Sequence, residues 1–125
     1  MLRLTTAAEP SELDAPIDTD VYRRLADIME EELPTIVAEF IESTTRLLAE
    51  IALAETARDA LQIKKRAHNL KSSSAVLGAL RLSAIARDLE RRSGDGTLVF
   101  PSAFGQMLDS EFARVSSELE RLSRS

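Results

Sequence analysis

The sequence predicts an all-α protein, an antiparallel four-helix bundle with a short additional N-terminal helix. Apolar residues recur at three- and four-residue steps along most of the chain, the spacing that gives an α-helix one apolar face. Four Gly and four Pro leave few residues for the turns of a sandwich or barrel. Only Thr97–Phe100 resembles a strand, and it is too short to stand alone. With 44% hydrophobic and 4% aromatic residues, the core must consist mainly of aliphatic side chains.

The first helix is expected to follow an N-terminal tail. Residues 1–16 show no sustained hydrophobic period and contain two prolines. We therefore predict a flexible tail over 1–16 and a helical bundle domain over 17–125. Asp18 or Thr19 can cap the first helix. Its apolar positions follow at i, i+4, i+7 and i+8: Val21, Leu25, Ile28 and Met29.

The second and third helices are predicted from caps and periodicity. The second runs over about 34–54, because Pro34 suits a first helical turn, where its missing N–H costs nothing. It carries one broad apolar stripe: Val37, Phe40, Ile41, Thr44, Leu47, Leu48 and Ile51. Thr56 and Asp59 then resemble a capping box for the third helix, which continues to about Leu77.

The fourth and fifth helices are separated by turn-forming residues. The fourth spans about 80–92 and ends at the Ser93–Gly96 cluster. Pro101 and Ser102 open the last helix, whose apolar residues again follow at three- and four-residue steps: Phe104, Leu108, Phe112, Val115, Leu119 and Leu122. Helices of this length with short connections form an up-and-down bundle.

Composition excludes several kinds of active site. The chain has no Cys, which excludes disulfides, thiolate metal sites and cysteine nucleophiles. Its single His, His68, excludes sites that need two imidazoles, and we expect no metal site. The net charge is −5, yet residues 59–95 carry eight basic and four acidic side chains. Such a protein is a poor nucleic-acid binder but can dock an acidic protein surface. The sequence shows neither a membrane span nor a leader, so we expect a cytoplasmic location without membrane association.

The third helix has two different faces. Its apolar residues form a seam with alternating steps of three and four: Ala60, Ile63, Ala67, Leu70, Ser74 and Leu77. At about 100° per residue, His68 lies roughly 130° from the centre of this seam. The helical phase therefore predicts an exposed imidazole on the outer face of the helix.

Cations and small residues surround this histidine. Ammonium groups three or four residues away would neutralise an attached phosphoryl group through charge-assisted hydrogen bonds. Small neighbours keep the surface low, so that a large partner can approach. The pattern predicts a phosphate-accepting histidine, flanked by Lys71, with a docking surface that consists of Leu61, Lys64, Lys65, Ser72 and Ala75.

The residues from His68 to Ala79, HNLKSSSAVLGA, resemble the signature of histidine-containing phosphotransfer (HPt) domains, H-x-L-K-[GS]-S-[SA]-x-x-L-G-A. The resemblance continues at the family's spacing through Leu82, Ala86, Leu89 and Glu90, so that it covers about 23 positions. The flanking helices, from about 18 to 122, agree with the family only in pattern.

This resemblance implies a monomeric helical bundle that relays phosphate in a two-component system. By this likeness, His68 accepts a phosphoryl group from the aspartate of one response-regulator receiver domain and passes it to another, with a hybrid sensor kinase among the partners. Lys71 would stabilise the phosphate, Gly78 would form the bend after the motif, and Glu90 would lie near the histidine. Ser72 stands where many members have Gly, and this difference can narrow the choice of receiver.

We expect a phosphocarrier rather than an enzyme. The chain lacks a G-x-x-x-x-G-K-[ST] loop, so neither ATP binding nor autokinase activity is expected. No cofactor is expected, and Mg²⁺ would be held by the partner receiver domain. The main alternative is an HPt-like docking module that regulates a two-component partner without transfer. A hydrolase built on Ser72 and His68 would lack an oxyanion hole, and nucleic-acid binding would lack aromatic residues beside the basic ones.

Overall fold

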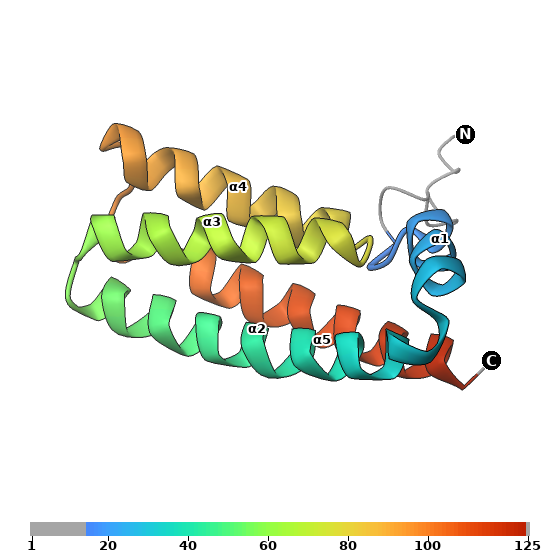
Figure 1. Ribbon diagram of the computed structural model, residues 1–125. Coiled ribbons are helices and arrows are strands. Elements are labelled where there is room, and N and C mark those ends of the chain that lie inside the picture. Colours follow the sequence, from blue (N-terminus) through green and yellow to red (C-terminus); the bar gives the residue numbers. More distant parts are fainter. Residues whose placement is uncertain (1–14, 125) are drawn as a thin grey trace, which may run out of the picture.

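The computed structural model describes residues 15–124 and is helical over most of this range (Figure 1). The elements, in chain order, are α1 (Thr19–Met29), the 3-10 helix η3 (Glu30–Glu32), α2 (Leu33–Thr56), α3 (Ala60–Val76), α4 (Leu80–Asp95) and α5 (Phe104–Ser123). Residues 97–100 form no strand. The tail predicted over 1–16 lies outside the described residues, except for its last two positions.

The four long helices form an antiparallel bundle, and α1 lies across one end of it (Figure 1). Helix α3 packs most extensively against α4 and next against α2, while α5 packs against both α2 and α4. The prediction of a four-helix bundle with a short additional N-terminal helix is confirmed.

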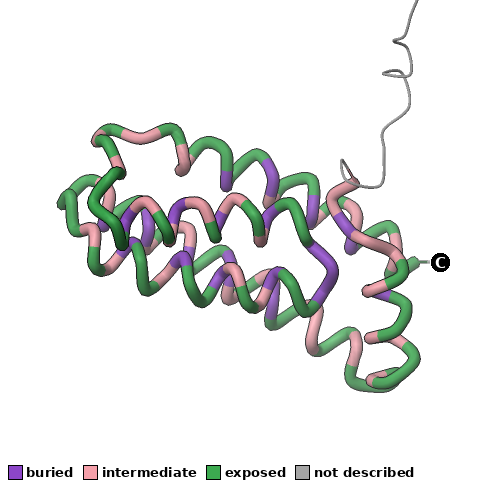
Figure 2. Tube along the Cα trace, turned by 90° about the horizontal axis from the view of Figure 1, so that it is seen from above, coloured by how far each residue is buried: buried purple, intermediate pink, exposed green. Residues whose placement is uncertain are grey.

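The core follows the apolar seam that the sequence predicts for α3. Ile63, Ala67, Leu70 and Ser74 are all fully buried. Buried residues of the four long helices face one another along the bundle axis, while the outward faces are exposed (Figure 2). Because the seam faces inward, the opposite face of α3 is available for interactions with other molecules.

The start of α1 is fastened to the turn between α3 and α4. Asp18 is the N-cap, and its carboxylate accepts hydrogen bonds from the backbone N–H groups of Asp20 and Val21. The backbone N–H of Asp18 donates to the carbonyl of Gly78 at 2.8 Å. Gly78 has φ +84°, a conformation that glycine adopts without strain. This turn therefore sets both the reversal of the chain after α3 and the position of α1.

Two sequence predictions at the helix starts need correction. Thr56 does not cap α3, because it still belongs to α2 and its hydroxyl donates to the carbonyl of Ala52. Asp59 caps α3 instead, with its carboxylate accepting from the N–H of Gln62. The last helix begins at Phe104 rather than at Pro101, because Ser102 is held by Glu55 of α2 through its N–H and hydroxyl.

The length of α4 and the orientation of α1 also differ from prediction. Helix α4 continues to Asp95, and the left-handed residue that ends it is Gly96, whose N–H donates to the carbonyl of Arg92. In α1, the hydrophobic spacing predicts Ile28 on the apolar face, but Ile28 is 77% exposed. Tyr22 is buried in its place. A large aromatic ring covers more core surface than Ile28 does, which explains the rotation of the helix.

Replacing Thr44 by Val is expected to stabilise the protein by about 1 kcal/mol, because a buried hydroxyl without a partner costs free energy. Thr44 is fully buried, and its Oγ1 has no hydrogen-bond partner. Thermal unfolding measures the change. Thr45→Val is the matched control, since the exposed hydroxyl of Thr45 already donates to the carbonyl of Ile41 at 2.8 Å. An unchanged or lower melting temperature for Thr44→Val would contradict the expectation.

Candidate functional site

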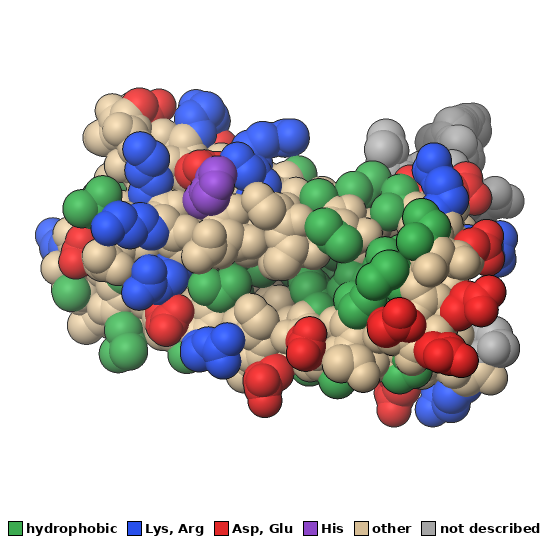
Figure 3. Space-filling view, viewed as in Figure 1, with side chains coloured by type: hydrophobic (Ala, Val, Ile, Leu, Met, Phe, Trp, Pro, Cys, Tyr) green, Lys and Arg blue, Asp and Glu red, His purple; other side chains and the backbone are tan. Residues whose placement is uncertain are grey.

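His68 lies on the exposed face of α3, at the position that the helical phase predicts. Its side chain is 57% exposed. Figure 3 shows Lys and Arg side chains around the histidine on this face, whereas Asp and Glu side chains gather over the region of α1 and α2. The local surface is therefore basic although the whole chain is acidic.

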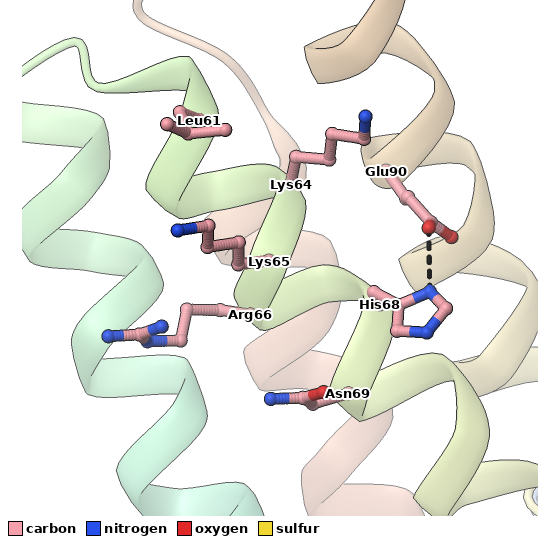
Figure 4. A pocket seen from close by; sticks show the side chains of 7 residues that line it. All are labelled: Leu61, Lys64, Lys65, Arg66, His68, Asn69 and Glu90. Atoms are coloured by element: carbon pink, nitrogen blue, oxygen red, sulfur yellow. Dashed lines mark hydrogen bonds and ion pairs between the residues drawn. The ribbon is translucent and has the colours of Figure 1, made fainter.

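Glu90 of α4 holds the histidine from the neighbouring helix. Its Oε2 lies 2.8 Å from Nδ1 of His68 (Figure 4). A carboxylate can only accept a hydrogen bond, so Nδ1 carries the hydrogen and donates it. In the neutral ring, the other nitrogen, Nε2, then carries the free lone pair. Figure 4 shows Nε2 on the side of the ring away from Glu90.

The same carboxylate also binds Lys71. Its Oε1 lies 2.7 Å from Nζ of Lys71. The hydrogen bond from Lys71, together with that from His68, lowers the pKa of Glu90 below its ordinary value of 4.5, although partial burial opposes the shift. Glu90 is consequently ionised at neutral pH. It links His68 and Lys71 through two separate oxygens, so that both side chains have defined positions.

The pocket beside His68 is open and follows the outer surface of α3. Six of its lining residues belong to α3 and one to α4: Leu61, Lys64, Lys65, Arg66, His68, Asn69 and Glu90 (Figure 4). Three of the five residues predicted to form a docking surface, Leu61, Lys64 and Lys65, thus share this pocket with the histidine. Leu61 is 58% exposed and gives this side of the pocket an apolar surface.

The other two predicted docking residues lie further along α3 and do not line this pocket. Ser72 is exposed, and its hydroxyl donates to the carbonyl of His68 at 3.3 Å. This bond turns the hydroxyl back onto its own helix, so that it protrudes little. Ala75 is exposed and small. No large side chain of these two residues therefore protrudes next to His68 toward the C-terminal end of α3.

Two pocket residues were not singled out from the sequence. Asn69 lines the pocket, and Arg66 pairs with Glu50 of α2, with Nε and Oε1 3.0 Å apart. The charge pattern of the sequence contains Arg66, but nothing in it reveals the pairing across helices. Helix spacing alone therefore does not tell which cations of α3 form ion pairs with other helices.

The described residues hold neither a metal-binding cluster nor a membrane span. Within 15–124, no three His, Asp or Glu side chains come together as metal ligands. In the same range, no helix combines the length and the apolar character needed to cross a bilayer.

Comparisons with known proteins agree with this geometry. The family model described as "Hpt domain" matches residues 35–124. A search of curated proteins found no match. Among solved structures, the chain is similar to histidine-containing phosphotransfer protein B (HptB) from Pseudomonas aeruginosa PAO1. The TM-score is 0.83 at 27% identity, and the match covers 87% of this chain and 95% of that one. The family match includes α3 and α4, which carry His68, Lys71 and Glu90, and the chain belongs to the Hpt domain family.

Proposed function

We propose that this protein is a phosphocarrier in a two-component phosphorelay. His68 accepts a phosphoryl group from the aspartate of a receiver domain and passes it to a second response regulator. The proposal depends on one observation in a chain of the Hpt family, namely that the imidazole is both oriented by a carboxylate and exposed. Nδ1 is held by Glu90 at 2.8 Å, and Nε2 belongs to a ring that is 57% exposed.

The transfer is an in-line displacement at phosphorus. The lone pair of Nε2 attacks the phosphorus atom, the P–N bond forms, and the bond to the aspartyl oxygen breaks with its electron pair left on the carboxylate. The hydrogen on Nδ1 stays in place, so the phosphorylated ring carries a positive charge. Passing the group to the next aspartate reverses these steps.

Glu90 has two tasks in this reaction. Its acceptor oxygen fixes the ring with Nε2 outward, and its negative charge stabilises the positive ring that transfer creates. Lys71 is paired with Glu90, and its positive charge, close to the reacting group, stabilises the phosphate electrostatically. Positioning and charge neutralisation therefore supply the chemistry of this side of the reaction.

The partners supply the rest. The receiver domain contributes the acidic pocket and Mg²⁺, and a hybrid sensor kinase feeds the relay, because this chain has no loop for ATP. The protein itself acts as a carrier without autokinase activity. We expect it to work as a monomer in the cytoplasm.

The docking surface is formed by one face of α3. Leu61, Lys64 and Lys65 lie at one side of His68, and Ser72 and Ala75 at the other. The lysines attract the acidic rim of a receiver pocket, and the small residues let the pocket approach the imidazole. Ser72, in the place of the glycine that many relatives have, narrows the set of receivers that fit.

Transfer from a phosphorylated receiver tests the proposal. Wild-type protein is expected to take up acid-labile, alkali-stable phosphate, and His68→Gln is expected to take up none. Both proteins should have the same helical circular dichroism spectrum, because the side chain is exposed. Equal labelling of the two would disprove the assignment of His68. Absence of transfer from a panel of receivers that nevertheless bind would instead indicate a docking module.

A further inference from the structure

Lys71 is not a free cation in the unphosphorylated protein. Its ammonium lies 2.7 Å from Oε1 of Glu90, whose other oxygen binds His68. A phosphoryl group that arrives at Nε2 brings additional negative charge. If Lys71 moves to this group, Glu90 loses its counter-ion. A second cation on the Nε2 side of the ring would remove this conflict.

The register of α3 and α4 shows where such a cation must lie. The hydroxyl of Ser83 donates to the carbonyl of Lys71, Glu90 reaches His68, and the side chain of Lys64 lies against Gly94. The two helices therefore run antiparallel, and residues that precede Glu90 on α4 face the C-terminal part of α3. Figure 4 shows Nε2 of His68 pointing toward that part of α3.

Among the cations of α4, this register points to Arg87. It precedes Glu90 by one helical turn, a spacing at which Cβ atoms are about 5–6 Å apart. It is also two turns before Gly94, so both lie on the flank of α4 that faces the exposed side of α3. Arg87 is exposed, and its guanidinium makes no hydrogen bond or ion pair within residues 15–124. Its neighbours Arg91 and Arg92, by contrast, pair with Asp88.

We propose that Arg87 binds the phosphoryl group on Nε2 of His68. The guanidinium donates to two phosphoryl oxygens, while Lys71 stays paired with Glu90 and Glu90 keeps its bond to Nδ1. This inference rests on the proposed phosphocarrier function and adds a phosphate-binding residue from the neighbouring helix.

The lifetime of the phosphorylated protein tests this role without a partner. Wild type, Arg87→Gln and Arg87→Lys are phosphorylated with phosphoramidate, whose P–N bond breaks with release of ammonia as the bond to His68 forms. After removal of the donor, the loss of phosphate is followed by mass spectrometry. Arg87→Gln is expected to lose phosphate roughly three to five times faster than wild type, the upper part of the range that the free energy of an exposed ion pair allows. Arg87→Lys should fall between the two, because one ammonium replaces a bidentate donor.

A titration and a matched control separate phosphate binding from a structural role. The phosphorus resonance of Arg87→Gln should titrate at higher pH than that of wild type, since the guanidinium favours the dianion. Arg91→Gln removes the same charge from the same helix and should change neither the lifetime nor the titration. Equal lifetimes of wild type and Arg87→Gln, or equal shortening in Arg91→Gln, would overturn the role of Arg87. Failure of phosphoramidate and of phosphorylated receivers to label wild type would overturn the phosphocarrier function itself.

Discussion

Replacing Glu90 by Ala is expected to slow phosphoryl transfer to His68 by about tenfold to a hundredfold. Loss of a carboxylate that orients a metal-binding histidine typically lowers activity by the same factor. The substitution removes the acceptor for Nδ1, so the ring can rotate and the hydrogen can move to Nε2, where it blocks the nucleophilic lone pair. It also removes the negative charge opposite the phosphorylated, positively charged ring. Lys71 is released at the same time, and its free ammonium compensates only part of the loss.

The conservative substitution separates orientation from charge. Glu90→Gln keeps an oxygen that can accept from Nδ1 but has no charge, so its transfer rate should lie between those of wild type and Glu90→Ala. Asp88→Asn is the control, because Asp88 is on the same helix but pairs with Arg91 and Arg92. Single-turnover transfer at saturating receiver concentration measures the chemical step apart from docking. A wild-type rate for Glu90→Ala would mean that the contact with His68 has no part in transfer.

Gly78→Ala is expected to destabilise the protein by about 3 kcal/mol, from a left-handed conformation that costs about 1–2 kcal/mol and from crowding that costs about as much again. A Cβ at this position would lie 2.8 Å from the carbonyl oxygen of Asp18 and 3.1 Å from Cβ of Val21. Both atoms belong to the segment that places α1 on the bundle. Relief would require α1 to move and would weaken the hydrogen bond between Asp18 and Gly78.

Two other glycines serve as controls that separate the cost of the left-handed conformation from the cost of crowding. Gly96 has φ +79°, but a Cβ added there would have nothing within 4 Å, so Gly96→Ala should show the conformational cost alone, about 1 kcal/mol. Gly105 is helical and equally open, and Gly105→Ala should raise stability by about 0.5 kcal/mol. Thermal and urea unfolding rank the three variants. If Gly78→Ala and Gly96→Ala were equally stable, crowding at Gly78 would be negligible.

Much of the candidate site can be predicted because it lies on one helix. His68, its lysine neighbours and the seam that contains Ala67 are related by a constant rotation per residue, so periodicity alone places the imidazole outside and Ala67 inside. The expectation that Glu90 lies near the histidine comes only from the family resemblance. That one carboxylate binds both His68 and Lys71 depends on the register of α3 and α4, which no local pattern contains.

The errors in the fold have the same origin. Thr56 and Asp59 match a capping box in spacing, but α2 continues through Thr56, whose hydroxyl donates to the carbonyl of Ala52 within the same helix. In α1, the hydrophobic spacing of Ile28 favours burial, yet the position of this short helix at the end of the bundle buries Tyr22 instead. Local helix propensity is weak compared with tertiary contacts. The exact residue at which a helix begins or ends therefore depends on its neighbours in space.

The sequence by itself determined the all-α bundle, the exposed histidine on the third helix and the motif of the Hpt family. Each of these depends on the spacing of residues within one helix or one motif, where the geometry of the backbone is known in advance. The tertiary structure alone decided which charged side chains of different helices meet. Packing of α4 against α3 places Glu90 on Nδ1 of His68 and pairs Lys71 with the same carboxylate. Arg87, for which we propose a role in binding the phosphoryl group, makes no ion pair within residues 15–124.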